Sequence, residues 1–265
     1  MWHGDLPPST SDLEDTVTAS PVELAGFPTS GRTPQAPSYA HAHWYFLATL
    51  GVIMAGFWGS FFRPAAARDV VHSIHGVTAT LWIMLLAGQS FLMSRGQVRW
   101  HRRVARGAFL LMPVMLLSAV HIVRVMIVNA TIPAPIGPML ALFDLPVVVF
   151  TGVMFGVGLA NVRRPSAHKR FMAATVLPGL SPALARLFQT LGSPSFFFAL
   201  HASLVVTHAV LVALIVSDWR NGVRERAYPL ALAFFLTLHA VLVPVGTSAW
   251  WGAQMTRFAT APWPL

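Results

Sequence analysis

Residues 195–217 read SFFFALHASLVVTHAVLVALIVS, a run without a single charged side chain. A transmembrane helix needs about 20 consecutive apolar residues, so this run predicts one. It also contains His201 and His208. Ionisable side chains are costly in a bilayer and normally face a bundle interior or a partner. The run therefore predicts both a membrane protein and a site built from histidines.

The rest of the chain has the same character. Of its 265 residues, 55% are apolar and 10% are charged, whereas an average soluble domain is about 25% charged. The pattern predicts an all-α, polytopic membrane helical bundle of about seven transmembrane helices in a lipid bilayer. One stretch contains Pro178, Pro182 and Arg186, and we expect it to be broken or tilted. The six further predicted spans are 41–61, 71–94, 104–127, 138–160, 169–189 and 228–250.

The N-terminal residues differ from the rest. Residues 1–38 hold five of the nine acidic residues among many Pro, Ser, Thr and Gly, so we expect a disordered or extended cytoplasmic tail there. Residues 39–265 form the predicted transmembrane helical bundle. The chain has no cysteine, which excludes disulfides, iron–sulfur clusters and covalent c-type haem attachment.

The basic residues predict the orientation. They concentrate in the connections after the second, fourth and sixth predicted spans, whereas the connections near 128–137 and 190–194 have none. Because basic connections stay in the cytoplasm, we expect the N-terminus inside. Arg63 and Arg68 depart from this pattern. The net charge of +9 therefore indicates topology and lipid contacts and not nucleic-acid binding.

Histidines lie within four of the predicted spans, and one lies at the mouth of a span. Since a helix rises about 1.5 Å per residue, each position converts to a depth. We expect one layer in the outer half of the bilayer, with two further histidines beneath it and two arginines above it. The layer contains His72, His75, His121, Asp144 and His201; His208 and His239 lie deeper, and Arg124 and Arg186 lie above.

The first functional interpretation is haem b. Two imidazoles on different helices at one depth can ligate iron, and haem propionates need cations nearby. His75 pairs in depth with His121 or His201, and His201 pairs with His239. The resulting protein would transfer electrons within or to a membrane complex. A second, inner haem can be placed between His101 and His168; alternatively, both residues lie in basic loops and only face lipid phosphate. The predicted cofactor-binding residues are His75, His121, His201, His239, Arg124 and Arg186.

Two other interpretations remain open. Histidines with one carboxylate suit non-haem iron, copper or zinc. Alternatively, the protein is a non-catalytic accessory subunit that packs against a larger membrane complex or itself binds quinone or pigment. Each histidine could also simply hydrogen-bond across helices, and Asp144 could pair with Arg124 or Arg186. The predicted metal ligands are His72, His75, His121, Asp144, His201 and His208.

One segment resembles a known pattern. It contains His72-Ser-Ile-His75-Gly76, then Trp82, Gln89 and Arg95, and then His101-Arg102-Arg103 before Gly107. It resembles a family of uncharacterised bacterial polytopic membrane proteins and is similar to transmembrane b-type dihaem cytochromes of the ascorbate-reductase kind. The resemblance implies a bacterial inner-membrane protein in which His75 (or His72) and His101 belong to different haems. The later position of the Gly, and seven spans where that pattern has six, depart from it.

Overall fold

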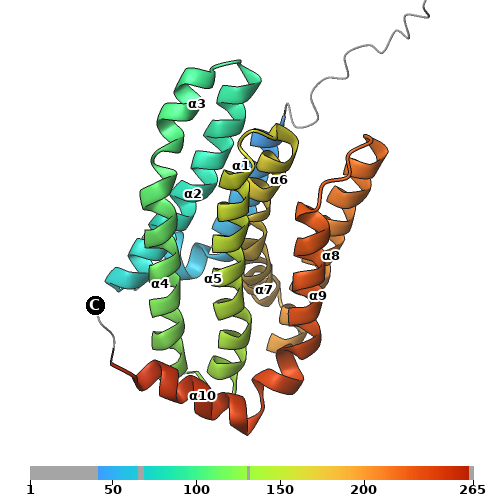
Figure 1. The fold of residues 1–265 in the computed structure, drawn as a ribbon. Helices are drawn as coiled ribbons and strands as arrows, with labels where there is room; N and C mark the ends of the chain where they lie inside the picture. Colours follow the sequence, from blue (N-terminus) through green and yellow to red (C-terminus); the bar gives the residue numbers. More distant parts are fainter. Residues whose placement is uncertain (1–40, 65–68, 130–131, 263–265) are drawn as a thin grey trace, which may run out of the picture. The chain divides into compact units, whose positions relative to one another are not determined.

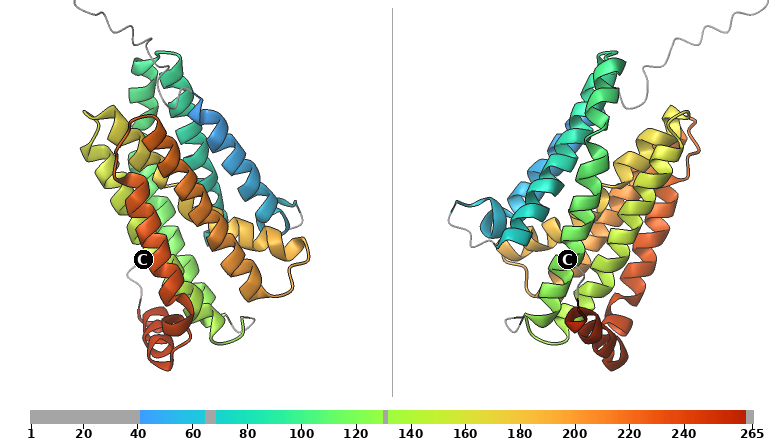
Figure 2. Two further views of the ribbon diagram at one scale, coloured as in Figure 1. Left: turned by 90° about the vertical axis from the view of Figure 1, so that its right-hand side faces the viewer. Right: turned by 60° about the vertical axis from the view of Figure 1, so that its left-hand side comes forward.

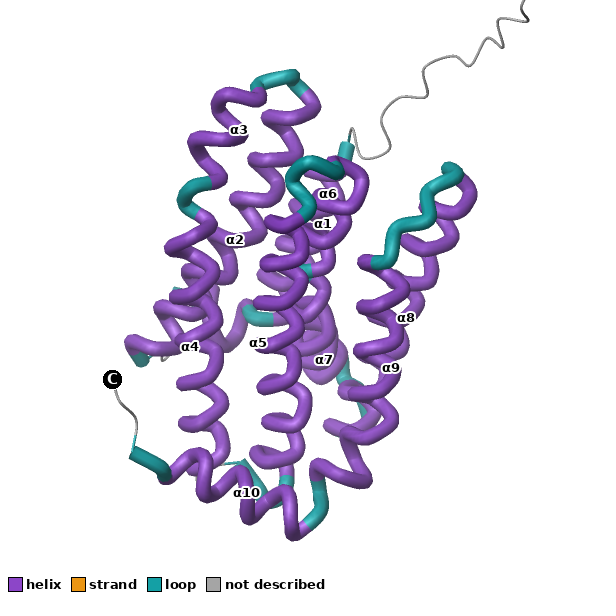
Figure 3. The backbone as a smooth tube through the Cα atoms, in the orientation of Figure 1, coloured by secondary structure: helices purple, strands orange, loops and turns teal. Residues whose placement is uncertain are grey.

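The computed structural model describes residues 41–64, 69–129 and 132–262, and every regular element within them is a helix (Figure 1 and Figure 3). The predicted tail, residues 1–38, lies outside the described residues. The helices are α1 (Ala42–Gly56), α2 (Val70–Ser94), α3 (Val98–Ala105), α4 (Ala108–Val128), α5 (Ile136–Ala160), α6 (Pro165–Ala174), α7 (Leu180–Thr190), α8 (Phe196–Arg220), α9 (Ala227–Gly246) and α10 (Ala249–Thr260).

Six helical segments of the described chain are long and apolar enough to cross a membrane. They are α2, α3 with α4, α5, α6 with α7, α8 and α9, which confirms an all-α integral membrane bundle. The first predicted span, 41–61, is shorter than expected. There, α1 has only 15 residues and is followed by a π-helical turn at Trp58–Phe62, whereas a full crossing needs about 20 residues.

The long helices form a closed ring in which each packs on the next. The order around the ring is α1, α2, α4, α5, α9, α8 and α7, and α7 packs back on α1. The segment from α6 to α7 is the most enclosed, with 67% of its most apolar window buried, against 22–39% for the other five. This enclosure explains why its sequence is the least apolar of the six. Figure 2 shows the helices from two further sides.

Two helix breaks differ from a simple span pattern. As expected for the stretch 169–189, a 3-10 turn at Leu177–Gly179 interrupts it between α6 and α7. By contrast, the basic connection predicted after α2 is mostly helical, because α3 begins at Val98. Gly96 makes the tight turn before it with φ of 68°, a conformation that favours glycine. His101 therefore lies on a helix and not in a loop.

Specific contacts hold the helices in register. Trp82 of α2 is only 2% exposed, and its indole N–H donates to the Thr175 hydroxyl at 2.9 Å. At Gly56, a side chain would collide with the Ala183 carbonyl, so glycine allows α1 to approach α7 closely. The arginine-rich connections of α2–α3, α5–α6 and α8–α9 lie at one end of the bundle (Figure 1), as the predicted orientation requires.

The last helix, α10, was not expected from the sequence. Ser248 caps its first turn by accepting the Trp251 amide at 3.2 Å. The Trp251 indole N–H donates to the Pro138 carbonyl at 2.7 Å. α10 packs on α4 and α5 and crosses their ends (Figure 1), so the predicted span 228–250 ends early, at Gly246.

Candidate functional site

Three of the five histidines predicted within the membrane form one cluster. His201 Nδ1 of α8 and His239 Nε2 of α9 are 2.7 Å apart, which is a hydrogen bond. Their ring centroids are 5.0 Å apart and the rings are stacked at 26°. The ring of His208 lies 5.3 Å from that of His239. We call His201, His208 and His239 the outer histidine cluster, and His201 with His239 its dyad.

The helices explain why these three rings meet. His201 and His208 are two turns apart on one face of α8, and α9 packs directly on α8. Leu204 and Leu211 on α8, together with Phe235 and Leu242 on α9, are completely buried and fix the register of this pair. The α8–α9 pair thus brings three polar side chains together within an apolar segment.

The dyad lines a groove of about 610 Å³. Its other lining residues are Leu236, Ala240, Val243 and Pro244 of α9. Nearby exposed side chains are also apolar, with Val205 57% and Leu236 49% exposed, so this surface faces lipid in a membrane. His201 and His239 are half-buried and form a polar spot on an apolar face.

This spacing does not suit haem ligation by the dyad. Two imidazole nitrogens that share one metal ion need to be roughly 4 Å apart, since each bond is about 2 Å long. At 2.7 Å the two rings bond each other directly. The predicted pairing of His201 with His239 therefore occurs, but as a hydrogen bond and not as a ligand pair.

His75 and His72 have other partners. The His75 ring Nδ1 lies 3.2 Å from the Met115 carbonyl and 3.3 Å from the Ser118 hydroxyl, both on α4. At the start of α2, the Asp69 carboxylate accepts the His72 backbone N–H at 2.8 Å and contacts the His72 ring at 2.8 Å. The backbone hydrogen bond, with help from the ring, lowers the pKa of Asp69. His72 therefore contributes to a helix cap.

The remaining members of the predicted layer are also separated from the dyad. His121 is half-buried on α4. Asp144 on α5 and Arg186 on α7 influence each other's charge, but no ion pair within 4 Å joins them among the described residues, so the expected pairing stays a prediction. The Arg186 guanidinium also lies 4.4 Å above the Phe57 ring. Within the described residues, no group of three or more His, Asp or Glu side chains is arranged to hold a metal ion, so the six predicted ligands do not meet.

Arg124 contacts the backbone of α10. Its guanidinium donates to the carbonyls of Phe258 at 2.7 Å, Ala259 at 2.9 Å and Ala261. These carbonyls lie at the C-terminal end of α10, where helices leave acceptors unpaired. The predicted role of Arg124 as a propionate partner is therefore replaced by a structural one.

A second histidine group lies at the opposite, arginine-rich end. The His168 ring Nδ1 of α6 donates to the Gly158 carbonyl of α5 at 2.8 Å. With its amide turned so that the N–H groups face acceptors, Gln89 of α2 donates to the His101 ring Nδ1 and to the His101 carbonyl, the latter at 3.1 Å. His101 and His168 are close enough for their charges to interact. We call Gln89, His101 and His168 the inner histidine group.

A buried ion pair supports the inner group, and the sequence did not predict it. Arg170 Nε and Nη2 each donate to an Asp218 carboxylate oxygen at 2.6 Å, which ties α6 to α8. Arg170 also donates to the Ser166 hydroxyl at 2.8 Å. Arg170 is 1% and Asp218 5% exposed. In the sequence, Arg170 follows Lys169 in a basic segment, which predicts a cytoplasmic connection and not a buried side chain. Asp218, the one acidic residue within α8, was the sequence feature that could have indicated the pair.

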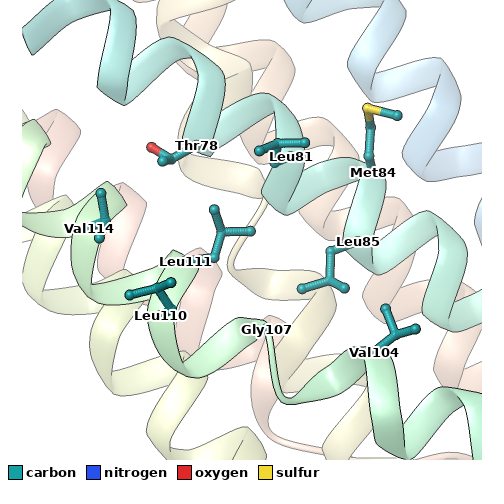
Figure 4. A pocket seen from close by; sticks show the side chains of 9 residues that line it. All are labelled: Thr78, Leu81, Met84, Leu85, Val104, Gly107, Leu110, Leu111 and Val114. Atoms are coloured by element: carbon teal, nitrogen blue, oxygen red, sulfur yellow. The ribbon is translucent and has the colours of Figure 1, made fainter.

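A second groove, of about 600 Å³, runs between α2 and the α3–α4 segment (Figure 4). Its nine lining residues are apolar except for Thr78, whose hydroxyl donates to the Ile74 carbonyl of its own helix at 2.8 Å. Figure 4 shows leucine side chains of both helices along it. This groove offers contact area for an acyl chain but no ionisable group.

Comparison of the chain with protein-family models, with curated proteins and with solved structures found no match in any of the three.

Proposed function

We propose that this protein is a haem b protein of the bacterial inner membrane, with its haem between His101 and His168 of the inner histidine group, and that it transfers electrons within or to a larger membrane complex. The observation that carries the proposal is that Nδ1 of each ring is hydrogen-bonded, in His168 as a donor to the Gly158 carbonyl and in His101 as an acceptor from the Gln89 amide. Metal-ligating histidines almost always donate from their second ring nitrogen, as His168 does.

The anchoring leaves Nε2 of each ring as the atom that can ligate iron. A neutral His168 that donates from Nδ1 has an unprotonated Nε2. The Gln89 amide N–H donates to Nδ1 of His101, so a neutral His101 carries its ring proton on Nε2. His168 can bind a metal with its anchoring bond intact, whereas His101 would need the Gln89 amide to turn so that its oxygen accepts Nδ1–H.

The helices that carry the two rings pack on different neighbours. α3 packs mainly on α2 and α4, whereas α6 packs mainly on α5 and α9. The two histidines nevertheless interact across this separation. Haem needs such an arrangement, because the macrocycle keeps the ligating helices apart while their side chains reach inward.

The charges around the inner group suit a dianionic haem. Arg99, Arg102 and Arg103 lie on α3, and Arg164 directly precedes α6. Arginine pairs well with propionate carboxylates. Bound haem with two histidine ligands supplies one-electron redox chemistry and leaves no open coordination position, which favours electron transfer.

The test is spectroscopic. Protein purified from membranes of haem-supplied cells should show a Soret band and an alkaline pyridine haemochrome, with about one iron per chain for one such site. His101→Ala and His168→Ala should lose the haem. His121→Ala is the matched control, because His121 is half-buried on the adjoining helix α4 and should retain it.

Rescue separates ligation from folding. His168→Gly should regain the haem spectrum when free imidazole is added, because imidazole can occupy the vacated position. A wild-type sample without haemochrome would overturn the proposal. Loss of haem in His75→Ala with retention in His168→Ala would contradict the inner position.

A further inference from the structure

We propose that the groove between α8 and α9 binds the head group of a lipid-soluble quinone or quinol, with the His201–His239 dyad as its hydrogen-bonding wall. This site is separate from the haem site, and the inference does not depend on haem binding. The proposed ligand is a lipophilic ring with hydrogen-bonding oxygens at opposite positions.

The depth of the dyad selects the class of ligand. His201 lies about 8 Å along α8 from its first residue, and His239 lies about 10 Å along α9 from its last. Both are therefore below the lipid head groups of a bilayer. Because the surrounding exposed side chains are apolar, a ligand reaches the groove from the lipid phase, and a charged or strongly hydrated one would not.

The dyad offers one donor and one acceptor in either tautomeric form. One proton lies between His201 Nδ1 and His239 Nε2. When His201 donates it, His201 Nε2 is an acceptor and His239 Nδ1–H is a donor; when His239 donates it, the two roles exchange. A quinone carbonyl needs a donor and a quinol hydroxyl needs an acceptor, so the dyad can serve both redox forms without moving.

Pro244 adds an acceptor to the same groove. Proline has no N–H, so it cannot donate the ordinary helical hydrogen bond to the carbonyl four residues earlier. That carbonyl belongs to Ala240, and both residues line the groove. A quinol hydroxyl that is bound beside the dyad would find this oxygen available.

His208 extends the polar path into the bilayer. Its Nε2 is buried without a hydrogen-bond partner among the described residues, and its ring lies 5.3 Å from His239. Within the described part of the chain no hydrogen bond joins His208 to the dyad, so this third base would receive a proton from the dyad only after a side chain rotates. The groove, about 610 Å³ in volume, is open along the lipid-facing side of the helix pair, so a ligand head group would lie against the dyad and not inside an enclosed cavity.

The experiment uses delipidated protein in quinone-free nanodiscs. It is titrated with decyl-ubiquinone carrying ¹³C carbonyls. Wild type should bind one quinone per chain, and at least one carbonyl stretch should move to lower frequency than in an empty nanodisc, because a hydrogen bond weakens the C=O bond. His239→Phe should weaken binding about tenfold and remove the shift, since one hydrogen bond is lost.

A matched pair of variants tests the groove itself. Ala240→Phe fills the groove and leaves both histidines in place, so saturable binding should disappear. Ala233→Phe makes the same change on an exposed face of α9 outside the groove and should bind as wild type does. Equal binding by these two variants, or no saturable binding by wild type, would overturn the proposal.

Oligomeric state and haem content are measured on the same variants. If a second copy of the chain covers the groove, Ala240→Phe converts a stable dimer to a monomer and quinone never binds, which also overturns the proposal. A pyridine haemochrome on every variant distinguishes this site from the haem site. His239→Phe should keep its haem content, and His168→Ala should keep its quinone titration.

Discussion

Replacing Asp218 with Asn should be the most damaging single change at the inner end of the bundle. Arg170 is 1% exposed, and its two hydrogen bonds to Asp218, each 2.6 Å long, would lose their charged acceptor. Removing the charged partner of a buried residue is strongly destabilising and costs about 3–5 kcal/mol. The hydrogen bonds from Arg170 to Ser166 remain in this variant.

The assay is reversible unfolding in mixed micelles, followed by circular dichroism as the fraction of denaturing detergent rises. Arg220→Gln is the control, because Arg220 is an exposed charge near Asp218 on the same helix and should change the free energy of unfolding by less than about 0.5 kcal/mol. The double variant Arg170→Leu with Asp218→Leu should be less destabilised than Asp218→Asn, because it removes both charges.

The order of the variants in free energy of unfolding tests the argument. If Asp218→Asn costs less than about 1 kcal/mol, the pair behaves like a solvated surface ion pair and α6 is not enclosed as described. If the double variant is the least stable, packing and not charge dominates at this contact. Either result would refute the argument.

Three further changes test other contacts. Arg124→Leu should release α10, so hydrogen exchange over that helix should accelerate roughly tenfold; unchanged exchange would contradict the contact. Gly56→Ala should lower stability by about 1–3 kcal/mol through its collision with α7, whereas Gly51→Ala, which meets open space, should be neutral or slightly stabilising; equal melting temperatures would refute this. Because the pKa of Asp69 is lowered in the folded state, its stabilisation of α2 is present above its unfolded pKa of about 3.9 and is lost as the pH falls through the folded value; the protection of the His72 amide, relative to its intrinsic exchange rate at the same pH, should therefore fall at acidic pH, and Asp69→Asn should abolish that dependence.

Most of the helical architecture follows from hydropathy alone, since any apolar run of sufficient length must be helical in a bilayer. The two departures have different causes. α1 stops at Gly56 because the π-helical turn after it interrupts an otherwise continuous apolar run. α10 mixes polar and apolar residues and is too short to span, so hydropathy gives no signal for it.

The candidate sites were less predictable, because sequence position gives depth along a helix but not the neighbour that a side chain faces. The sequence places His75 and His201 at similar levels, yet α2 packs on α1 and α4 while α8 packs on α7 and α9. Only neighbouring helices could bring predicted partners together, as α8 and α9 do for His201 and His239. The two ring nitrogens are 2.7 Å apart, a distance that fits a hydrogen bond and not two ligands of one metal ion. This distance depends on side-chain packing, which the spacing of residues along the sequence does not give.

The two histidine sites are also too far apart to act as one. Asp218, which ties α8 to the helix that carries His168, lies about 25 Å along α8 from His201. His208 covers about 10 Å of that length, and beyond it Leu211 and Ile215 on the same helix are buried and apolar. A proton that enters at the outer dyad therefore has no continuous side-chain path along α8 to the inner group. Any coupling between quinone and haem would have to pass through electrons, so loss of one site should leave binding at the other unchanged.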